Sequence, residues 1–359
     1  MSVDTTYNPL GTDGFEFVEY TAADAEGIEK LKALFTSLGF AEVAKHKHKD
    51  AWLYRQGDIN FIVNGQPHSH ALEFAKKHGP SVCAMAFRVA DAKKAFEHAV
   101  ASGAKAYPNP VGPMELNIPA VYGIGESLLF FVDMYGEKDI YRIDFDFYDD
   151  YKARMARANA GLFEVDHLTH NVHQGNMAVW ADFYERIGNF REIRYFDIEG
   201  KLTGLVSKAM TAPCGKIRIP INESSDDKSQ IEEFLREYNG EGIQHIALTT
   251  DNIYKTVADL QARGTKFMTT PVTYYERVND RVPGHGEDLA RLQELNILID
   301  GMPSKDGILL QIFTETVIGP VFFEIIQRKG NEGFGEGNFK ALFESIEEDQ
   351  IRRGVLSDA

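Results

Sequence analysis

Residues 165–170 read Val-Asp-His-Leu-Thr-His, residues 242–248 read Gly-Ile-Gln-His-Ile-Ala-Leu, and each stretch is strand-like and precedes a helical pattern. Stretches of the same shape occur in the first half of the chain, at residues 15–17 and 82–84. After each of the four, apolar residues recur at helical spacing before further strand-like runs follow. The sequence therefore predicts a duplicated chain, in which each half repeats strands and helices in the same order.

Metal-binding side chains occupy the repeated positions of the second half. His167 and His245 lie in the two stretches quoted above, and Glu324 lies in Val-Phe-Phe-Glu-Ile-Ile-Gln at residues 321–327. The three residues are almost evenly spaced, and we expect them at equivalent places in successive repeat units. Two histidines and one carboxylate that leave coordination positions open are the ligand set of non-haem Fe(II) oxygenases. We expect one metal site per chain.

The first half lacks these ligands. Aligning the halves places Phe17, Ala84 and Val132 where the second half has two imidazoles and a carboxylate. The first half is therefore expected to be a scaffold without metal.

Strand alternation gives expectations for the neighbours of the ligands. It turns His167 away from Asp166, and it turns Gln244 away from His245. A carboxylate inside the apolar run around Glu324 is costly to bury unless a cation neutralises it. The alternative partner for Glu324 is Arg328, one helical turn or four strand positions further on.

Composition narrows the classes of function. The chain has 359 residues, enough for two domains, and a net charge of -16, which argues against nucleic acid and anionic membranes as partners. It contains two cysteines, too few for a disulfide framework. No apolar run is long enough to span a bilayer, and no secretory signal is visible at the N-terminus. These features predict a cytoplasmic protein.

The organisation of the chain follows from changes in composition. Residues 137–162 mix charge and aromatics, so we place the boundary there and expect domains at 1–150 and 151–359. The polar residues 273–289 are expected to form a surface loop. An amphipathic C-terminal helix is expected to begin with Asn338 as its N-cap, after a flexible segment of three glycines. Its apolar face would comprise Phe339, Leu342, Phe343 and Ile346.

The motifs that contain the three ligands, together with Leu-Leu-Gln-Ile-Phe-Thr at 309–314 and Gly-Phe-Gly-Glu-Gly-Asn-Phe-Lys at 333–340, resemble the 4-hydroxyphenylpyruvate dioxygenase family. The resemblance covers nearly the whole chain. It implies the vicinal-oxygen-chelate fold, of class α+β. Two pseudo-equivalent domains would each be built from paired βαβββ units that form an open β-barrel, and a C-terminal helix would close the active site of the second domain.

The resemblance also implies the activity and the pocket. The enzyme would use Fe(II), one per chain, to convert 4-hydroxyphenylpyruvate and O2 to homogentisate and CO2 in the catabolism of tyrosine and phenylalanine. It would form a homo-oligomer, a tetramer or dimer. Its implied catalytic residues are Ser207, Asn222, Gln230, Gln311 and Phe339. Its implied substrate-binding residues are these five together with Gln244, Phe313, Phe334 and Asn338.

Three alternatives stay open at this point. A 4-hydroxymandelate synthase would use the same substrate and ligands but hydroxylate the benzylic carbon. An extradiol catechol dioxygenase would need a further acid–base histidine near the metal, and neither His170 nor His173 shares the strand face of His167. A non-catalytic module would only sequester a metal or an aromatic ligand.

Overall fold

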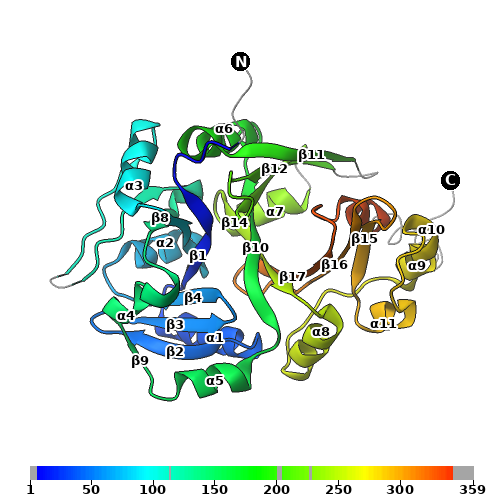
Figure 1. Cartoon of the computed structure of the whole chain (residues 1–359), viewed down its shortest axis with the longest axis horizontal. Coiled ribbons are helices and arrows are strands. Elements are labelled where there is room, and N and C mark those ends of the chain that lie inside the picture. The colour runs from blue at the N-terminus through cyan, green and yellow to red at the C-terminus, as the bar shows by residue number, and fades with distance from the viewer. Residues whose placement is uncertain (1–5, 113–114, 200–203, 226–228, 343–359) are drawn as a thin grey trace.

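The computed structural model describes residues 6–112, 115–199, 204–225 and 229–342, which form two mixed sheets flanked by helices (Figure 1). The elements of the first half follow in the order β1 Thr12–Thr21, α1 Ala25–Ser37, β2 Ala41–His46, β3 Ala51–Gln56, β4 Ile59–Asn64, α2 His70–His78, β5 Ser81–Val89, α3 Ala92–Ala101, β6 Ala106–Tyr107, β7 Ala120–Tyr122, β8 Leu128–Val132, α4 Tyr141–Asp144, β9 Phe145–Phe147 and α5 Tyr151–Ala158. Two 3-10 turns, at Ile124–Glu126 and Gly136–Lys138, flank β8.

The second half begins with the long strand that carries His167. Its elements are β10 Leu162–Val172, α6 Met177–Gly188, β11 Arg191–Glu199, β12 Gly204–Thr211, β13 Arg218–Ser224, α7 Gln230–Glu237, β14 Gly242–Thr250, α8 Ile253–Ala262, α9 Val272–Glu276, α10 Val278–Arg281, α11 Leu289–Glu294, β15 Leu298–Met302, β16 Gly307–Phe313 and β17 Phe322–Lys329. Residues 336–342 are also helical. None of the described helices is long and apolar enough to cross a membrane.

The two sheets share the same topology over eight strands, and β9 adds a ninth strand to the edge of the first sheet. Their strand orders are β6-β7-β8-β5-β1-β4-β3-β2-β9 and β15-β16-β17-β14-β10-β13-β12-β11. In each half, the first strands of two βαβββ units pair antiparallel at the centre, as β1 with β5 and β10 with β14. The last strand of each unit returns parallel to its first strand, as β13 beside β10 and β17 beside β14. The predicted α+β fold of paired units is confirmed.

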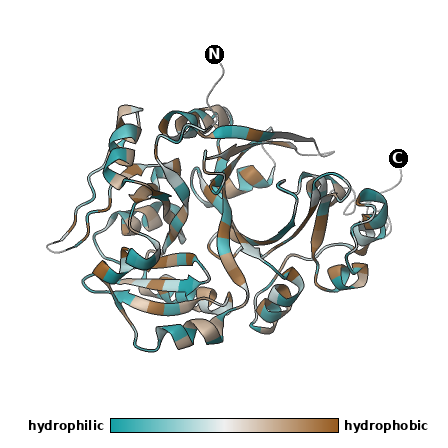
Figure 2. Ribbon diagram, viewed as in Figure 1, coloured by the Kyte–Doolittle hydropathy of each residue, from teal (hydrophilic) through white to brown (hydrophobic). Residues whose placement is uncertain are grey.

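Side-chain alternation gives each sheet two different faces. One face of both sheets contributes to a shared core that contains Val18, Phe35 and Leu168 together with Phe323 of β17. Brown, hydrophobic segments accordingly run along the strands of both sheets, whereas the outer helices mix teal and brown segments (Figure 2). The opposite face of the first sheet encloses a separate apolar cluster, and the opposite face of the second sheet carries the candidate metal ligands.

In the first half, apolar side chains occupy the positions at which the second half has its candidate ligands. Phe17 pairs with Ala86 as His167 pairs with Ala247, which confirms the alignment of Phe17. Ala247 pairs with Glu324, whereas Ala86 pairs with Phe130. The expected match of Val132 to Glu324 is therefore wrong by two residues.

Phe130 and Phe17 lie with ring centroids 5.6 Å apart. The same apolar cluster includes Met155 of α5, a helix that packs against β2. The first half therefore has a packed interior where the second half has polar groups.

The expected equivalence of the three ligands in successive units also needs correction. His167 and His245 lie on the first strands of two successive units, β10 and β14, but Glu324 lies on β17, the last strand of the second unit. Glu324 joins the histidines because β17 lies parallel to β14 and beside it, not because it repeats their position.

Residues 273–289 are not a surface loop. They contain most of α9 and all of α10, and Tyr274, Tyr275, Val278 and Val282 are buried. The helices in this segment are short, and polar residues separate their buried apolar residues. The sequence therefore shows no apolar stripe long enough to predict a buried helix face.

Asn338 is not an N-cap, because the C-terminal helix begins at residue 336 and Asn338 lies inside it. Leu342 ends the described part of this helix. The predicted face residues Phe343 and Ile346 lie outside the described residues.

Candidate metal centre

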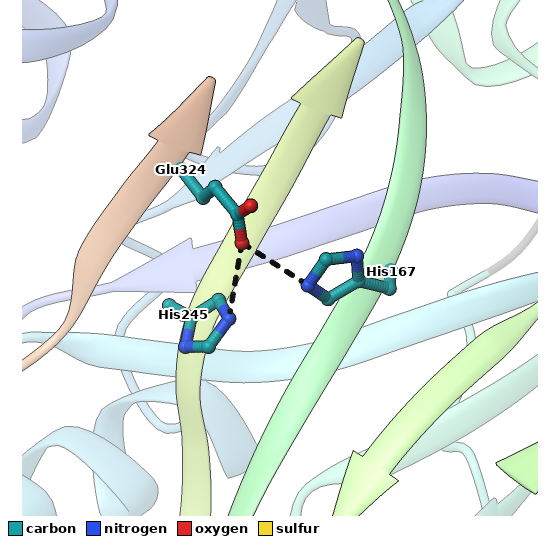
Figure 3. Close-up of side chains that lie close together, drawn as sticks. All are labelled: His167, His245 and Glu324. Atoms are coloured by element: carbon teal, nitrogen blue, oxygen red, sulfur yellow. Dashed lines mark ion pairs between the residues drawn. The ribbon is translucent and has the colours of Figure 1, made fainter. Parts of the chain in front are cut away.

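His167, His245 and Glu324 converge from three neighbouring strands on the inner face of the second sheet (Figure 3). Glu324 Oε2 lies 3.2 Å from Nε2 of His167 and 3.5 Å from Nε2 of His245. All three side chains are buried, and Glu324 is only 2% exposed. In the described part of the chain this is the one cluster of histidine, cysteine and acidic side chains with the geometry of a metal site.

Two β-bulges orient the histidine rings. The pairing of β10 with β14 skips Asp166 on one strand and Gln244 on the other, so each bulged residue precedes a histidine. Asp166 Oδ1 lies 2.7 Å from Nδ1 of His167, and Gln244 Oε1 lies 3.0 Å from Nδ1 of His245. The prediction that alternation turns both residues away from the histidines is therefore wrong. With Nδ1 held in this way, each ring presents Nε2 to the centre.

The same bulges occur in the half without ligands. The pairing of β1 with β5 skips Glu16 and Cys83, which precede Phe17 and Ala84 as Asp166 and Gln244 precede the two histidines. The bulges therefore belong to the duplicated fold, and the second half uses them to orient its ligands.

Arg328 pairs with Asp166 rather than with Glu324. Its Nε and Nη2 donate to the two carboxylate oxygens at 2.8 Å each, and Arg218 adds a contact of 3.5 Å. Burial would raise the pKa of Asp166, but the hydrogen bonds from Arg328 and His167 outweigh burial and lower the pKa far below its usual range. Asp166 is therefore a buried anion that accepts from His167 while it neutralises Arg328.

The electrostatics of the triad favour a cation. Burial would raise the pKa of Glu324, but His167 and then His245 outweigh it and lower that pKa to about 2. Burial opposes protonation of His167, yet Glu324 followed by Asp166 raises the pKa of this imidazole. For His245 burial prevails, and its pKa is lowered. The ionised Glu324 therefore favours positive charge at the centre. A divalent ion supplies two positive charges there, whereas protonation of one histidine supplies one.

The donor set fits a metal such as iron. Two imidazole nitrogens and one carboxylate oxygen form the 2-His-1-carboxylate set of non-haem iron oxygenases. The three candidate ligand atoms lie within 4.8 Å of one another, and both Nε2 atoms lie within 3.5 Å of the same carboxylate oxygen, so they are close enough to bind one ion together.

A cavity of about 670 Å³ opens beside the triad, within the range of small-molecule sites. Seven of the predicted substrate-pocket residues line it: Ser207, Asn222, Gln230, Gln244, Phe313, Phe334 and Phe339. Ser207 and Asn222 are directly opposite each other on β12 and β13, and the apolar Ile219 and Ile221 point into the core behind them. Phe339 is 37% exposed, so it is a wall of the cavity and not a buried anchor of its helix.

Gln311 and Asn338 do not line the cavity. Gln311 Nε2 donates to Glu324 Oε1 at 2.9 Å, and Asn338 Nδ2 donates to Gln311 Oε1 at 2.7 Å. Both act on the ligand rather than on the space where a substrate would bind.

Several lining residues escaped the sequence interpretation: Thr169, Met268, Thr270, Pro271, Asn296 and Leu298. Thr169 shares the strand face of His167, and its Oγ1 lies 2.9 Å from Nε2 of His245, so alternation could have identified it. Leu298 begins β15, and the remaining four lie in connecting segments, for which no periodic signal exists.

Among the described residues, no histidine besides His167 and His245 lies at the centre. His170 is buried on the opposite face of β10, where its Nε2 lies 2.7 Å from the Tyr184 hydroxyl, and His173 is exposed. The described cavity lining contains only His167 and His245, so the acid–base histidine required by the extradiol alternative is missing from it.

Two family models match the chain. Residues 6–146 match the model described as "Hydroxyphenylpyruvate dioxygenase, HPPD, N-terminal", and residues 164–278 match the "Glyoxalase/Bleomycin resistance protein/Dioxygenase superfamily".

Relatives that align with nearly the whole chain include members of the same dioxygenase family. The chain is 77% identical to hemolysin VllY of Vibrio vulnificus, over 98% of this chain and 99% of that protein. It is 67% identical to a 4-hydroxyphenylpyruvate dioxygenase of Pseudomonas aeruginosa, over 98% of each chain. Among solved structures, a mutant of 4-hydroxymandelate synthase from Streptomyces coelicolor superposes with a TM-score of 0.79 at 26% identity. That match covers 95% of this chain and 99% of the synthase.

Proposed function

Because the chain belongs to the 4-hydroxyphenylpyruvate dioxygenase family, whose activity converts 4-hydroxyphenylpyruvate and O2 to homogentisate and CO2, we propose that one Fe(II) per chain is held by His167, His245 and Glu324. The observation that carries this proposal is the convergence of two Nε2 atoms on one buried carboxylate oxygen. When bound, Fe(II) supplies the open positions at which a 2-oxo acid chelates and O2 is activated.

The charge of the cavity supports a chelating anion as the substrate. Its described lining contains no lysine or arginine, and Glu324 and Glu336 are its carboxylates. A substrate carboxylate therefore finds its positive partner only at the metal, where two charges of Fe(II) exceed the single charge of Glu324. The absence of cationic side chains from the described lining supports a binding mode with the 2-oxo acid end of the substrate at the triad and its ring toward the rest of the cavity.

The lining divides into polar and aromatic parts that suit a hydroxyphenyl ring. Ser207, Asn222 and Gln230 offer hydrogen-bonding groups on one wall, and Gln244 offers another beside His245. Phe334 lies edge-on to His167 with ring centroids 5.3 Å apart. We propose that the polar group orients the phenol.

The aromatic part, which also includes Phe313 and Phe339, excludes water from the metal. The role of Gln311 is different: its amide orients Glu324.

The experiment that tests the metal assignment compares iron content and product formation in His167→Ala, His245→Ala and Glu324→Ala. Each variant is expected to remain folded and to lose bound iron and homogentisate formation, whereas His173→Ala, which changes an exposed histidine, keeps both. A triad variant that retained near-normal homogentisate production would contradict its ligand role.

Benzylic hydroxylation is the second candidate, favoured by the superposition on 4-hydroxymandelate synthase. The dioxygenase relatives are far closer in sequence, at 54–67% identity. Mass spectrometry of the product, homogentisate against 4-hydroxymandelate, separates the two reactions.

Three further expectations stay proposals. The division into domains 1–150 and 151–359 follows the duplication, although the packing of α5 on β2 favours a boundary after Ala158. A homo-oligomer and a cytoplasmic location are tested by light scattering and by fractionation of the source cells.

A further inference from the structure

A chain of buried hydrogen bonds runs from Glu324 away from the cavity. Gln311 Nε2 donates to Glu324 Oε1 at 2.9 Å, and Asn338 Nδ2 donates to Gln311 Oε1 at 2.7 Å. The Tyr274 hydroxyl then donates to Asn338 Oδ1 at 2.6 Å, and Arg281 Nη2 donates to the Tyr274 hydroxyl at 2.6 Å. Apart from Arg281, which is partly buried, every member is at most 2% exposed.

The two ends of this chain fix the direction of every bond between them. A guanidinium has only donors, and an ionised carboxylate has only acceptors. An amide presents either its oxygen or its nitrogen, so an isolated Gln–Asn pair could bond in either sense. Arg281 Nη2 also donates directly to Asn338 Oδ1 at 3.2 Å. Arg281 Nη2 and the Tyr274 hydroxyl, which also contact the carbonyl of Ile299, therefore both present donors to Asn338. Asn338 turns its oxygen to these donors and its nitrogen to Gln311, which leaves the nitrogen of Gln311 for Glu324.

The consequence at the triad is that the two oxygens of Glu324 differ. Oε1 accepts the Gln311 amide, whereas Oε2 faces Nε2 of both histidines. We propose that Tyr274 and Arg281 are positioning residues of the metal centre: by setting the amide polarity of Asn338 and Gln311, they hold Glu324 to coordination through one oxygen. Coordination through both oxygens would occupy a position that a chelating substrate and O2 need.

The same contacts join the helix at 336–342 to the triad. Asn338 belongs to that helix, and its neighbour Gly337 donates through its backbone N to Asp300 Oδ2 at 2.8 Å. Asp300 also lies 3.5 Å from Arg281 Nη1. Phe339, which follows Asn338, lines the cavity. The helix that forms a cavity wall therefore also supplies the group that orients Gln311.

This inference rests on the proposed function, because it requires a metal at the triad. Its main test is Tyr274→Phe in the full-length protein, with Tyr275→Phe as the matched control. Tyr275 is the adjacent residue of α9 and equally buried, but it contributes no hydroxyl to the chain of bonds. Three quantities are measured: Fe(II) affinity by competition with a chelator, the visible absorption of the Co(II)-loaded protein, and kcat separately from KM.

Tyr274→Phe is expected to weaken Fe(II) binding about fivefold, the effect of one lost hydrogen bond, and to lower kcat more than it raises KM. It should also alter the Co(II) spectrum, because a second carboxylate oxygen changes the coordination number. Tyr275→Phe should match the wild type in all three. A folded Tyr274→Phe with the affinity and Co(II) spectrum of Tyr275→Phe would overturn the inference. Failure of the wild type to bind Fe(II) would instead contradict the proposed function.

A second pair of variants covers the case in which Tyr274→Phe does not fold. Asn338→Asp keeps the shape of the side chain but replaces the donor toward Gln311 with an acceptor, which forces the Gln311 amide to turn its oxygen to Glu324. Asn338→Ala only removes the donor. Asn338→Asp is therefore expected to weaken Fe(II) binding more than Asn338→Ala does, and an equal or smaller loss would overturn the inference.

Discussion

Arg328 forms a two-point ion pair with Asp166, from Nε to Oδ2 and from Nη2 to Oδ1, with both distances 2.8 Å. The remaining nitrogen of Arg328 donates to the carbonyls of Asn331 and Gly333, on the segment that leads to the aromatic wall of the cavity. Asp166 in turn holds His167. This buried ion pair therefore connects His167 to the segment that carries Phe334. A substitution in the pair should affect both the triad and the aromatic wall of the cavity.

Asp166→Asn should weaken Fe(II) binding by roughly 10- to 100-fold, because the amide holds His167 Nδ1 less strongly than the carboxylate does. It should also lower the free energy of unfolding by about 3 kcal/mol, since Arg328 stays buried without its counter-charge. Chelator competition and urea unfolding measure the two effects. Asp182→Asn, which breaks an exposed pair with Arg186, is the control and should change neither. Unchanged iron affinity in Asp166→Asn would remove Asp166 from the metal centre.

Gly335→Ala should displace Gln311. Gly335 has a φ of +77°, and a methyl group there would overlap Gln311 Oε1, so this glycine allows close approach and does not merely give the flexible segment expected from the sequence. We expect iron affinity and kcat to fall at least tenfold. Gly284→Ala is matched in backbone strain, because Gly284 also has a φ of +77° but nothing lies within 4 Å of its added carbon. Equal effects of the two variants would show that strain alone is responsible.

The stability of the protein should fall in acid partly through His170. Burial lowers the pKa of His170 to about 3, whereas an unfolded histidine has a pKa of about 6.5. Between these values the unfolded chain binds the extra proton, so the free energy of unfolding decreases as pH falls, by up to about 1.4 kcal/mol per pH unit. His170→Gln should lessen this slope between pH 6.5 and 4 in urea unfolding. His173→Gln, on the exposed histidine nearby, should leave it unchanged, and parallel slopes for all three proteins would refute the assignment.

Phe17→Ala should destabilise the protein without affecting the metal. Phe17 is buried in the apolar cluster of the first half, in contact with Phe130, so its truncation should cost about 3 kcal/mol. Iron stoichiometry, measured by elemental analysis of the folded variant, should stay at the wild-type value. Loss of iron at a temperature well below the unfolding transition would mean that the first half takes part in the site.

The sequence by itself determined the duplication and the α+β class, and it identified His167, His245 and Glu324 as candidate ligands. Each of these depends on a local pattern: strand and helix periods repeat within short windows, and a histidine or carboxylate inside an apolar strand is visible without knowing its neighbours. The pocket position of Asn222, which the family resemblance implied, also agrees with alternation, since Ile219 and Ile221 take the core face of β13.

Only the tertiary structure decided how these residues act on one another. Whether Asp166 and Gln244 face their histidines depends on bulges, and a bulge exists only in relation to the partner strand. The match of Phe130 rather than Val132 to Glu324 depends on the register between β5 and β8. The orientation that Arg281 imposes on Asn338 and Gln311 depends on contacts between residues 57 and 27 positions apart. Period and composition describe one segment at a time, whereas register and hydrogen-bond polarity arise only when distant segments meet.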